Sequence, residues 1–225
     1  MLFENKVTPE FTNKVQSIAD SLNMNPDWLM YVMNNESAGT FSPSVKNPGS
    51  TATGLIQFLS STAAGLGTST AALAKMSAID QLDYVQKYFQ KQIQAYGPIN
   101  SVSDTYLAVF YPAAISWSDT NKKFSDTVYS GNKIFDYDGL GYLTKGDFQD
   151  YVNFHYSKVG GSDSSSVTTS VDNEDNNNSD DSGDIPPISA DSYNADNIVL
   201  YAGLGVFVSL CIILIFLFAK KSKNE

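Results

Sequence analysis

The chain has 225 residues, enough for one or two domains, and its composition excludes several classes of function. It holds 24 acidic residues against 14 lysines and no arginine, so a basic groove for a nucleic-acid backbone is not expected. The single cysteine, Cys211, excludes a disulfide framework and a cysteine-based zinc site. The single histidine, His155, excludes most histidine-dependent chemistry, and we expect it to be a surface or packing residue.

Residues 1–130 are predicted to form a mainly α-helical domain. Capping residues and apolar residues at one-face spacing indicate four helices, which are expected to begin at Thr8, Asn25, Ser77 and Ser103. Gly39 is expected to end the second helix, and Pro112 the fourth. Residues 39–53 are rich in Gly, Pro, Ser and Asn, which favours a loop or an irregular hairpin.

The last part of the chain is predicted to connect this domain to a membrane. Residues 160–197 hold nine acids and no base, with few large apolar side chains, which is typical of a disordered acidic linker. Residues 198–219 form an uncharged run of 22 residues, long enough for a transmembrane helix, and a basic tail with three lysines follows at 220–225. No apolar leader opens the sequence, so we expect a tail-anchored, single-pass membrane protein.

Glu36 is the candidate catalytic acid. It lies seven residues after Leu29 and four after Val32, on the apolar face of the expected second helix. Partial burial there would raise the pKa of the carboxyl, and a carboxylic acid that stays protonated near neutral pH suits general-acid cleavage of a glycosidic bond. The alternative is an ordinary solvated glutamate at the end of a helix.

A series of short motifs surrounds and follows this glutamate: Glu36-Ser37, then Gly54-Leu55-Ile56-Gln57, then Thr62-Ala63. This series resembles the lytic transglycosylase signature of the goose-type lysozyme superfamily. A further family motif, an Ala-Tyr-Asn helix segment that lines the sugar site, corresponds to residues 107–111. Here Phe110 stands in place of the tyrosine and Tyr111 in place of the asparagine. The resemblance covers about residues 8–116 and implies a lysozyme-like helical fold.

The resemblance implies a peptidoglycan lytic transglycosylase that cuts the β-1,4 bond between N-acetylmuramic acid and N-acetylglucosamine. Glu36 would be the single general acid and base, since residues 37–79 contain no acid that could act as a second carboxylate. The implied substrate-binding residues are Ser37, Gly54, Ile56, Gln57, Phe110 and Tyr111.

Three of these residues have a stated role and a structural alternative. Ser37 would bond the sugar or the carboxyl, or else cap the helix. Gly54 would admit close approach of the glycan, or else only form a turn. Gln57 would offer both a donor and an acceptor to an N-acetyl sugar, or else be a solvated polar residue.

Residues 131–159 are expected to form an EF-hand-like loop and a helix that packs on the domain. The loop resembles an EF-hand or dockerin-type calcium loop, with possible ligands Asp136, Asp138, Tyr142 (through its carbonyl), Thr144 and Asp147. The fifth position of the loop is Leu140, which lacks a ligand oxygen, and the twelfth is an aspartate. Weak calcium binding is therefore possible but not required for activity, and the alternative is a turn without metal.

The expected partners are peptidoglycan strands, a lipid bilayer and capsid proteins. An enzyme of this type with a tail anchor and no leader resembles the virion-associated transglycosylases of membrane-containing phages. It would lie in the internal membrane of the virion, or in the host inner membrane, and open the cell wall locally during infection. The alternatives are a non-catalytic cell-wall-binding or virion structural protein on a lysozyme-like scaffold, a muramidase hydrolase, and a calcium-dependent adhesion module.

Overall fold

The computed structural model of the chain describes residues 1–136 and 138–162. The predicted membrane helix at 198–219, the basic tail and all but the first residues of the predicted acidic linker lie outside the described residues. Among the described residues, the structure contains no helix with the length and apolar character needed to cross a membrane. The membrane anchor therefore stays a prediction.

The described part of the chain is mainly helical, as expected from the sequence, and it contains no extended strand. Its α-helices are α1 (Pro9–Leu22), α2 (Pro26–Glu36), α3 (Ser60–Gly65), α4 (Thr70–Leu73), α5 (Ala78–Tyr96), α6 (Val102–Phe110), α7 (Asp126–Gly131) and α8 (Lys145–Lys158). Three short 3₁₀ helices accompany them: η1 (Glu4–Lys6), η2 (Pro112–Ala114) and η3 (Lys133–Phe135).

Most of the predicted helix starts are confirmed. The side chains that cap α1, α2 and α5 are those of Thr8, Asn25 and Ser77. The predicted start of the fourth helix at Ser103 is wrong, because Ser101 caps α6 and accepts a hydrogen bond from the Asp104 backbone N–H at 3.0 Å. Ser101 has the extended backbone that a capping residue needs, whereas Ser103 is already inside the first turn and buried.

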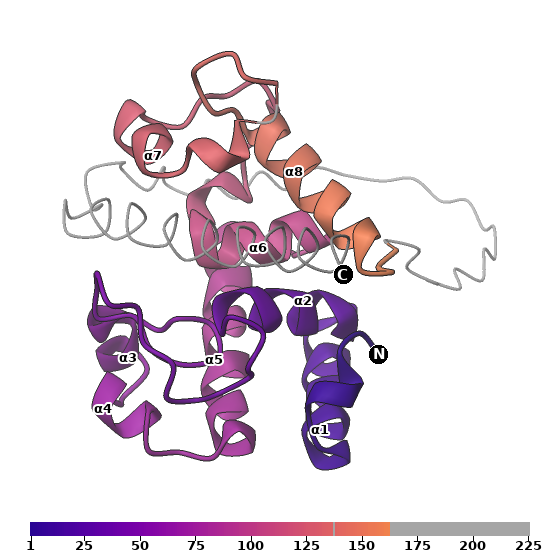
Figure 1. Cartoon of the computed structure of the whole chain (residues 1–225), viewed down its shortest axis with the longest axis vertical. Coiled ribbons are helices and arrows are strands. Elements are labelled where there is room, and N and C mark those ends of the chain that lie inside the picture. Colours follow the sequence, from indigo (N-terminus) through magenta and orange to yellow (C-terminus); the bar gives the residue numbers. More distant parts are fainter. Residues whose placement is uncertain (137, 163–225) are drawn as a thin grey trace, which may run out of the picture.

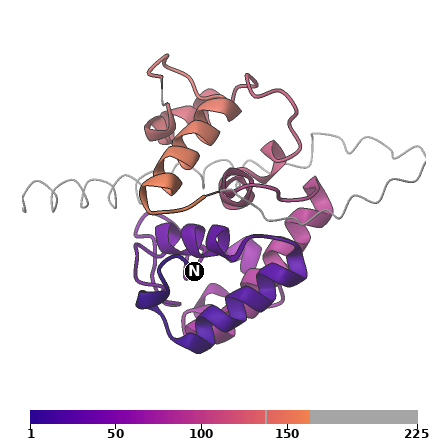
Figure 2. The same cartoon turned by 90° about the vertical axis from the view of Figure 1, so that its right-hand side faces the viewer.

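Helix α6 occupies the middle of the molecule, with α1 to α5 on one side and α7 and α8 on the other (Figure 1). It packs against both α2 and α8, and α1 packs against α2 and α5. A view from the side shows the same division, with α8 crossing above the N-terminal helices (Figure 2). The buried apolar side chains of all these helices form one continuous core.

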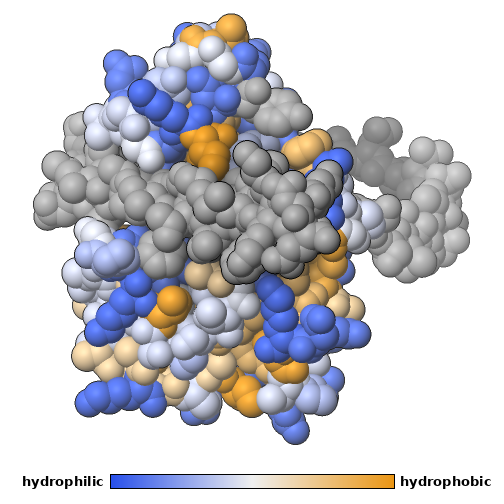
Figure 3. All heavy atoms as spheres, viewed as in Figure 1, coloured by the Kyte–Doolittle hydropathy of each residue, from blue (hydrophilic) through white to orange (hydrophobic). Residues whose placement is uncertain are grey.

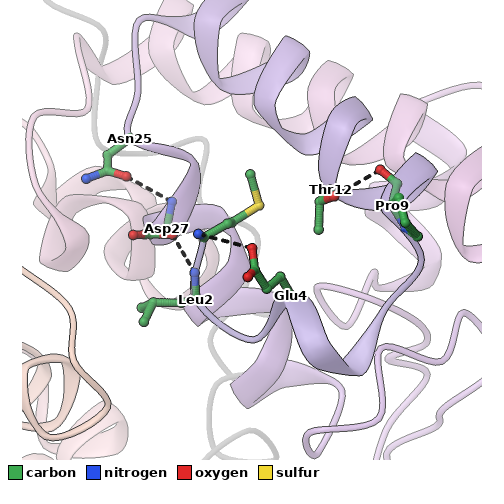
Figure 4. A network of polar contacts seen from close by, with 7 residues as sticks. Leu2, Glu4, Pro9, Thr12, Asn25 and Asp27 are labelled. Atoms are coloured by element: carbon green, nitrogen blue, oxygen red, sulfur yellow. Dashed lines mark hydrogen bonds and ion pairs between the residues drawn. The ribbon is translucent and has the colours of Figure 1, made fainter.

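The first residues of the chain fold back onto α2 (Figure 4). The Leu2 backbone N–H donates to Asp27 Oδ1 at 2.7 Å, and the Asp27 backbone N–H donates to Asn25 Oδ1 at 2.9 Å. Phe3 reaches beyond this network, and its ring lies 6.4 Å from that of Phe41. The N-terminal segment therefore supports the loop that follows α2.

The surface of the molecule is mixed in polarity on the face that Figure 3 shows, where apolar residues appear in scattered groups among hydrophilic ones. Among the described residues, the large apolar side chains exposed beyond one third of their area are Leu140, Phe154 and Val159. All three belong to the C-terminal part of the described chain, outside the helices that carry the motifs.

The predicted loop at residues 39–53 is confirmed, and it continues as irregular structure to Leu59. Isolated antiparallel bridges join Lys46 to Thr53 and Thr53 to Phe58. Hydrogen bonds within the loop, such as that from the Asn47 N–H to the Ala52 carbonyl, give it a local shape. Contacts from outside the loop are still needed to hold it against the helices.

Gln81, on α5, provides the main contacts of this kind. Its Oε1 accepts a hydrogen bond from the Leu55 backbone N–H at 2.7 Å. Its Nε2 donates to the carbonyl oxygens of Pro43 and Leu73, each at 3.0 Å. The side chain is fully buried, so one amide joins the loop, α4 and α5 in a water-free environment where hydrogen bonds are strong.

Replacement of Gln81 by leucine tests this role. The Gln81→Leu variant keeps a similar volume but leaves the buried Leu55 N–H without its partner, so we expect a loss of about 2–4 kcal/mol in the free energy of unfolding, measured with urea. Gln86→Leu on the same helix is the control, because the Gln86 amide bonds Ser21 Oγ at an exposed position. Equal losses in the two variants would contradict the role of Gln81.

Candidate active site

Glu36 is the last residue of α2, and its side chain is only 3% exposed. Leu29 and Val32 lie in the core on the same helix, so the predicted position of Glu36 on the apolar face is confirmed. The burial is more complete than the partial burial expected from the sequence, because α6 packs against α2 and covers this face.

Burial raises the pKa of Glu36 to about 8, and the Tyr106 hydroxyl opposes part of this rise. The carboxyl therefore carries its proton in most molecules at neutral pH. A general acid needs this protonation state before it can donate its proton to a glycosidic oxygen.

Tyr106, on α6, is the residue that faces Glu36, and it was missed in the analysis of the sequence. Its side chain is 3% exposed, and its pKa is raised well above the usual value by burial and by the nearby Glu36. The contact stops short of full hydrogen-bond geometry: within the described chain, Tyr106 Oη and Glu36 Oε1 both lack a hydrogen-bond partner. One sequence feature could have identified Tyr106: it lies four residues before the motif residue Phe110 and therefore on the same face of the helix.

Ser37 directly follows Glu36 and is fully buried. It is the C-cap residue of α2, and its Oγ accepts a hydrogen bond from the Phe41 backbone N–H at 2.8 Å. This arrangement corresponds to the structural alternative, in which Ser37 shapes the end of the helix and the start of the loop.

Gly54 has a backbone φ of +85°, a conformation that favours glycine. A Cβ atom at this position would lie 2.3 Å from Gln81 Oε1. The absence of a side chain at Gly54 therefore lets the Gln81 side chain approach the backbone. The analysis of the sequence had proposed that the glycan approaches there. The neighbouring Ile56 is 3% exposed and belongs to the core.

Gln57 is 4% exposed, and its amide has a fixed orientation. Its Nε2 donates to the Gly54 carbonyl at 3.0 Å and lies 3.4 Å from the Val45 carbonyl. Its Oε1 is buried and has no hydrogen-bond partner in the part of the chain that the structure describes. The Nε2 donor that was expected to bind the sugar is thus bonded within the protein, and only the Oε1 acceptor is left without a bond.

Phe110 and Tyr111 lie in different surroundings. The Phe110 ring is 2% exposed and stacks on Phe148, with ring centres 4.8 Å apart. It is therefore part of the aromatic core, and the expected contact with substrate is not supported. Tyr111 is half-buried, with its ring 5.6 Å from that of Trp117 and 5.2 Å from that of Phe124.

The predicted calcium loop holds its first carboxylate by internal hydrogen bonds. Asp136 Oδ2 accepts from Tyr129 Oη at 2.9 Å and from the Gly141 backbone N–H at 3.0 Å. Asp138 Oδ1 accepts from the Leu140 N–H at 3.2 Å, and the Leu140 side chain is 59% exposed. These hydrogen bonds hold the two carboxylates of the turn in place.

The last residues of the predicted calcium loop form the start of helix α8. Thr144 and Asp147 form a capping box for α8, in which Asp147 Oδ2 accepts from the Thr144 backbone N–H at 2.8 Å and from Thr144 Oγ1 at 2.7 Å. Over residues 1–136 and 138–162, no three His, Cys, Asp or Glu side chains come together as a metal site would require. That result does not cover carbonyl or hydroxyl oxygens such as those of Tyr142 and Thr144, so calcium binding by the donors at 136–147 stays a prediction.

Comparison with known families gives one match. The family model described as "Transglycosylase SLT domain" matches residues 13–110. The matched stretch runs from within α1 to the end of α6 and includes all of the motif residues except Tyr111. It supports a lytic transglycosylase domain with peptidoglycan as its substrate. No curated protein matches the chain.

The raised pKa of Glu36 makes a prediction about stability. The ordinary pKa of 4.5 applies to the unfolded chain, whereas the pKa in the folded chain is about 8. Between these values the unfolded state ionises while the folded state keeps its proton, so stability falls as the pH rises, and it stays low above about 8.

We therefore expect the Glu36→Gln variant to have the same melting temperature as the wild type near pH 4, and a higher one as the pH approaches about 8. Thermal unfolding across this range measures the difference. Glu10→Gln is the control: Glu10 is exposed and hydrogen bonds lower its pKa, so its replacement should not raise the melting temperature as the pH rises. A constant difference between wild type and Glu36→Gln would contradict the raised pKa.

Proposed function

We propose that the described domain cleaves the β-1,4 bond between N-acetylmuramic acid and N-acetylglucosamine, with Glu36 as its single general acid and base. The observation that carries this proposal is the buried Glu36 carboxyl, whose pKa of about 8 keeps it protonated at neutral pH. Its position within the stretch matched by the transglycosylase family supports the same reaction class.

In the first step, Glu36 gives its proton to the glycosidic oxygen. The bond between this oxygen and C1 of the muramyl residue breaks, and the N-acetylglucosamine leaves with a free 4-hydroxyl. Positive charge develops at C1, where the acetamido oxygen of the substrate itself is available to stabilise it. The protein then holds a carboxylate at Glu36, which Tyr106 is close enough to stabilise.

In the second step, the Glu36 carboxylate takes the proton of the muramyl 6-hydroxyl. The oxygen of that hydroxyl forms a bond to C1, which gives a 1,6-anhydro sugar. One proton has left Glu36 and one has returned, so the enzyme is restored and no water is consumed. This route suits a site where residues 37–79 provide no second carboxylate.

Gln57 would recognise the substrate through its acceptor. Its Nε2 is already bonded within the loop, and its buried Oε1 has no partner among the described residues. A buried acceptor favours a ligand that brings an N–H group, such as the acetamido group of an N-acetyl sugar. Tyr111, which is half-buried, would be a further contact for the glycan.

Two other functions compete with this one. A muramidase hydrolase would use the same Glu36 with water as the acceptor. A cell-wall-binding or virion structural protein would use the scaffold without catalysis, and the altered motif at residues 110–111 is the feature that favours it. A pure binder would gain nothing from an acid whose burial lowers the stability of the fold.

Product analysis separates these functions. The full chain and its Glu36→Gln variant would be incubated with purified peptidoglycan, and the released fragments weighed by mass spectrometry. We expect anhydro-muramyl products from the wild type and a loss of activity of at least about a thousandfold in the variant, because the proton donor is gone. Products with a reducing end would indicate a hydrolase, and no release from folded protein would favour a binder.

We propose that this activity is delivered from a membrane. The observations that support this are in the sequence: the apolar run at 198–219, the lysines after it, and the acidic linker before it. In a phage with an internal membrane, a domain that first faces the cytoplasm would end on the outer side of the virion membrane. From there it would reach the cell wall during infection.

Fractionation of purified virions tests this location. We expect the chain to remain with the lipid fraction after the capsid is removed, because 22 uncharged residues provide a stable anchor. A variant that ends before residue 198 is the control and should leave the lipid fraction. Absence of the full chain from that fraction would contradict the proposal.

A further inference from the structure

The family match ends at residue 110. Residues beyond this point also pack around the candidate active site. The C-terminal unit, residues 124–158, packs onto α6 from the side opposite α2 (Figure 1). The rings of Phe135 and Phe148 from this unit lie 6.4 and 5.8 Å from the Tyr106 ring. The C-terminal unit therefore forms one wall around the tyrosine that faces Glu36.

Tyr151, on α8, brings a second hydroxyl to this wall. Its side chain is 7% exposed, and its ring lies 4.9 Å from that of Phe135, which also contacts Tyr106. The Tyr151 phenol is close enough to Tyr106 to contribute to the raised pKa of Tyr106. Tyr31, on α2, also contributes, and its ring is 6.2 Å from that of Tyr106.

Three buried oxygens in this region lack hydrogen-bond partners within residues 1–136 and 138–162. They are Glu36 Oε1, Tyr106 Oη and Tyr151 Oη. Each buried polar group left without a bond costs about 1–3 kcal/mol, so such a group needs a reason. One reason is that the bonds form only when Glu36 has lost its proton, because a carboxylate is a far stronger acceptor than a carboxylic acid.

We propose that Tyr151 is a positioning residue for the reaction of Glu36: its hydroxyl donates to Tyr106 Oη, and the Tyr106 hydroxyl then donates to the Glu36 carboxylate. This inference rests on the proposed function. No covalent bond changes in this chain of hydroxyls, and both tyrosines keep their protons. Each donor polarises the next, so Tyr151 strengthens the bond between Tyr106 and Glu36.

The other titratable groups near this chain are few. Tyr31 faces Tyr106 from α2, and its own pKa is raised to about 12 by burial. His155 lies on α8 with its ring 4.3 Å from that of Tyr151, and partial burial lowers its pKa. His155 is therefore neutral in the pH range where Glu36 ionises, and neither group changes charge there.

The first test measures the pKa of Glu36 without using activity. The melting temperature would be followed against pH in the wild type, Tyr151→Phe, Tyr106→Phe and the double variant, each with and without Glu36→Gln. The pH at which the Glu36→Gln effect levels off reports the pKa of Glu36. We expect Tyr151→Phe and Tyr106→Phe to raise it by about half a unit to one unit, the size of one hydrogen bond.

The double variant decides whether Tyr151 acts through Tyr106. If it does, the double variant shifts the pKa no further than Tyr106→Phe alone. Additive shifts, or no shift in Tyr151→Phe, would overturn the proposal. Tyr129→Phe is the control in the same unit, because the Tyr129 hydroxyl bonds Asp136 instead, and it should leave the pKa of Glu36 unchanged.

The second test uses activity on peptidoglycan. We expect Tyr151→Phe to lower kcat about three- to tenfold with KM unchanged, because the hydroxyls act on the ionised Glu36 that forms during the reaction. The alkaline limb of the pH profile should move upward with the pKa of Glu36. A wild type without activity would contradict the proposed function, whereas an active wild type with an unaffected Tyr151→Phe would contradict only the role of Tyr151.

Discussion

The burial of one carboxyl at the end of a helix is the constraint on which the rest of this structure depends. Glu36 is 3% exposed, and burial is the main cause of its raised pKa. Its position at the C-terminal end of α2 acts in the same direction, because the helix dipole disfavours a negative charge there. This cost in stability arises because α6 packs against α2 and covers the carboxyl.

The loop after α2 meets a similar constraint by using side-chain amides in place of regular structure. Gln81 holds the loop from outside and requires that residue 54 be a glycine. Gln57 holds it from inside and leaves one acceptor unused. Two amides therefore give an irregular segment a defined shape. Rigid placement of this kind is what the proposed single-acid mechanism would require.

The C-terminal unit shares its aromatic core with helix α6 of the matched domain. Phe110, which sits at a family motif position, packs against Phe148 of α8, and Tyr106 packs against rings from the same unit. Two features of the structure accompany Phe110 at the position where the resembling motif has a tyrosine. The ring gains a place in a larger core, and a tyrosine one helical turn earlier presents its hydroxyl to Glu36.

The sequence by itself determined the helical class, three of the four predicted helix starts, and the place of Glu36 on an apolar face, because these depend on local capping and on the 3.6-residue period. Only the tertiary structure decided that Tyr106 faces Glu36, that Gly54 makes room for Gln81, and that Phe110 belongs to the core. These are contacts between elements distant in the chain, and no local pattern specifies which side chains meet. The orientation of the Gln57 amide could not be predicted from the sequence for the same reason, since its partners are backbone carbonyls that the folded loop brings together.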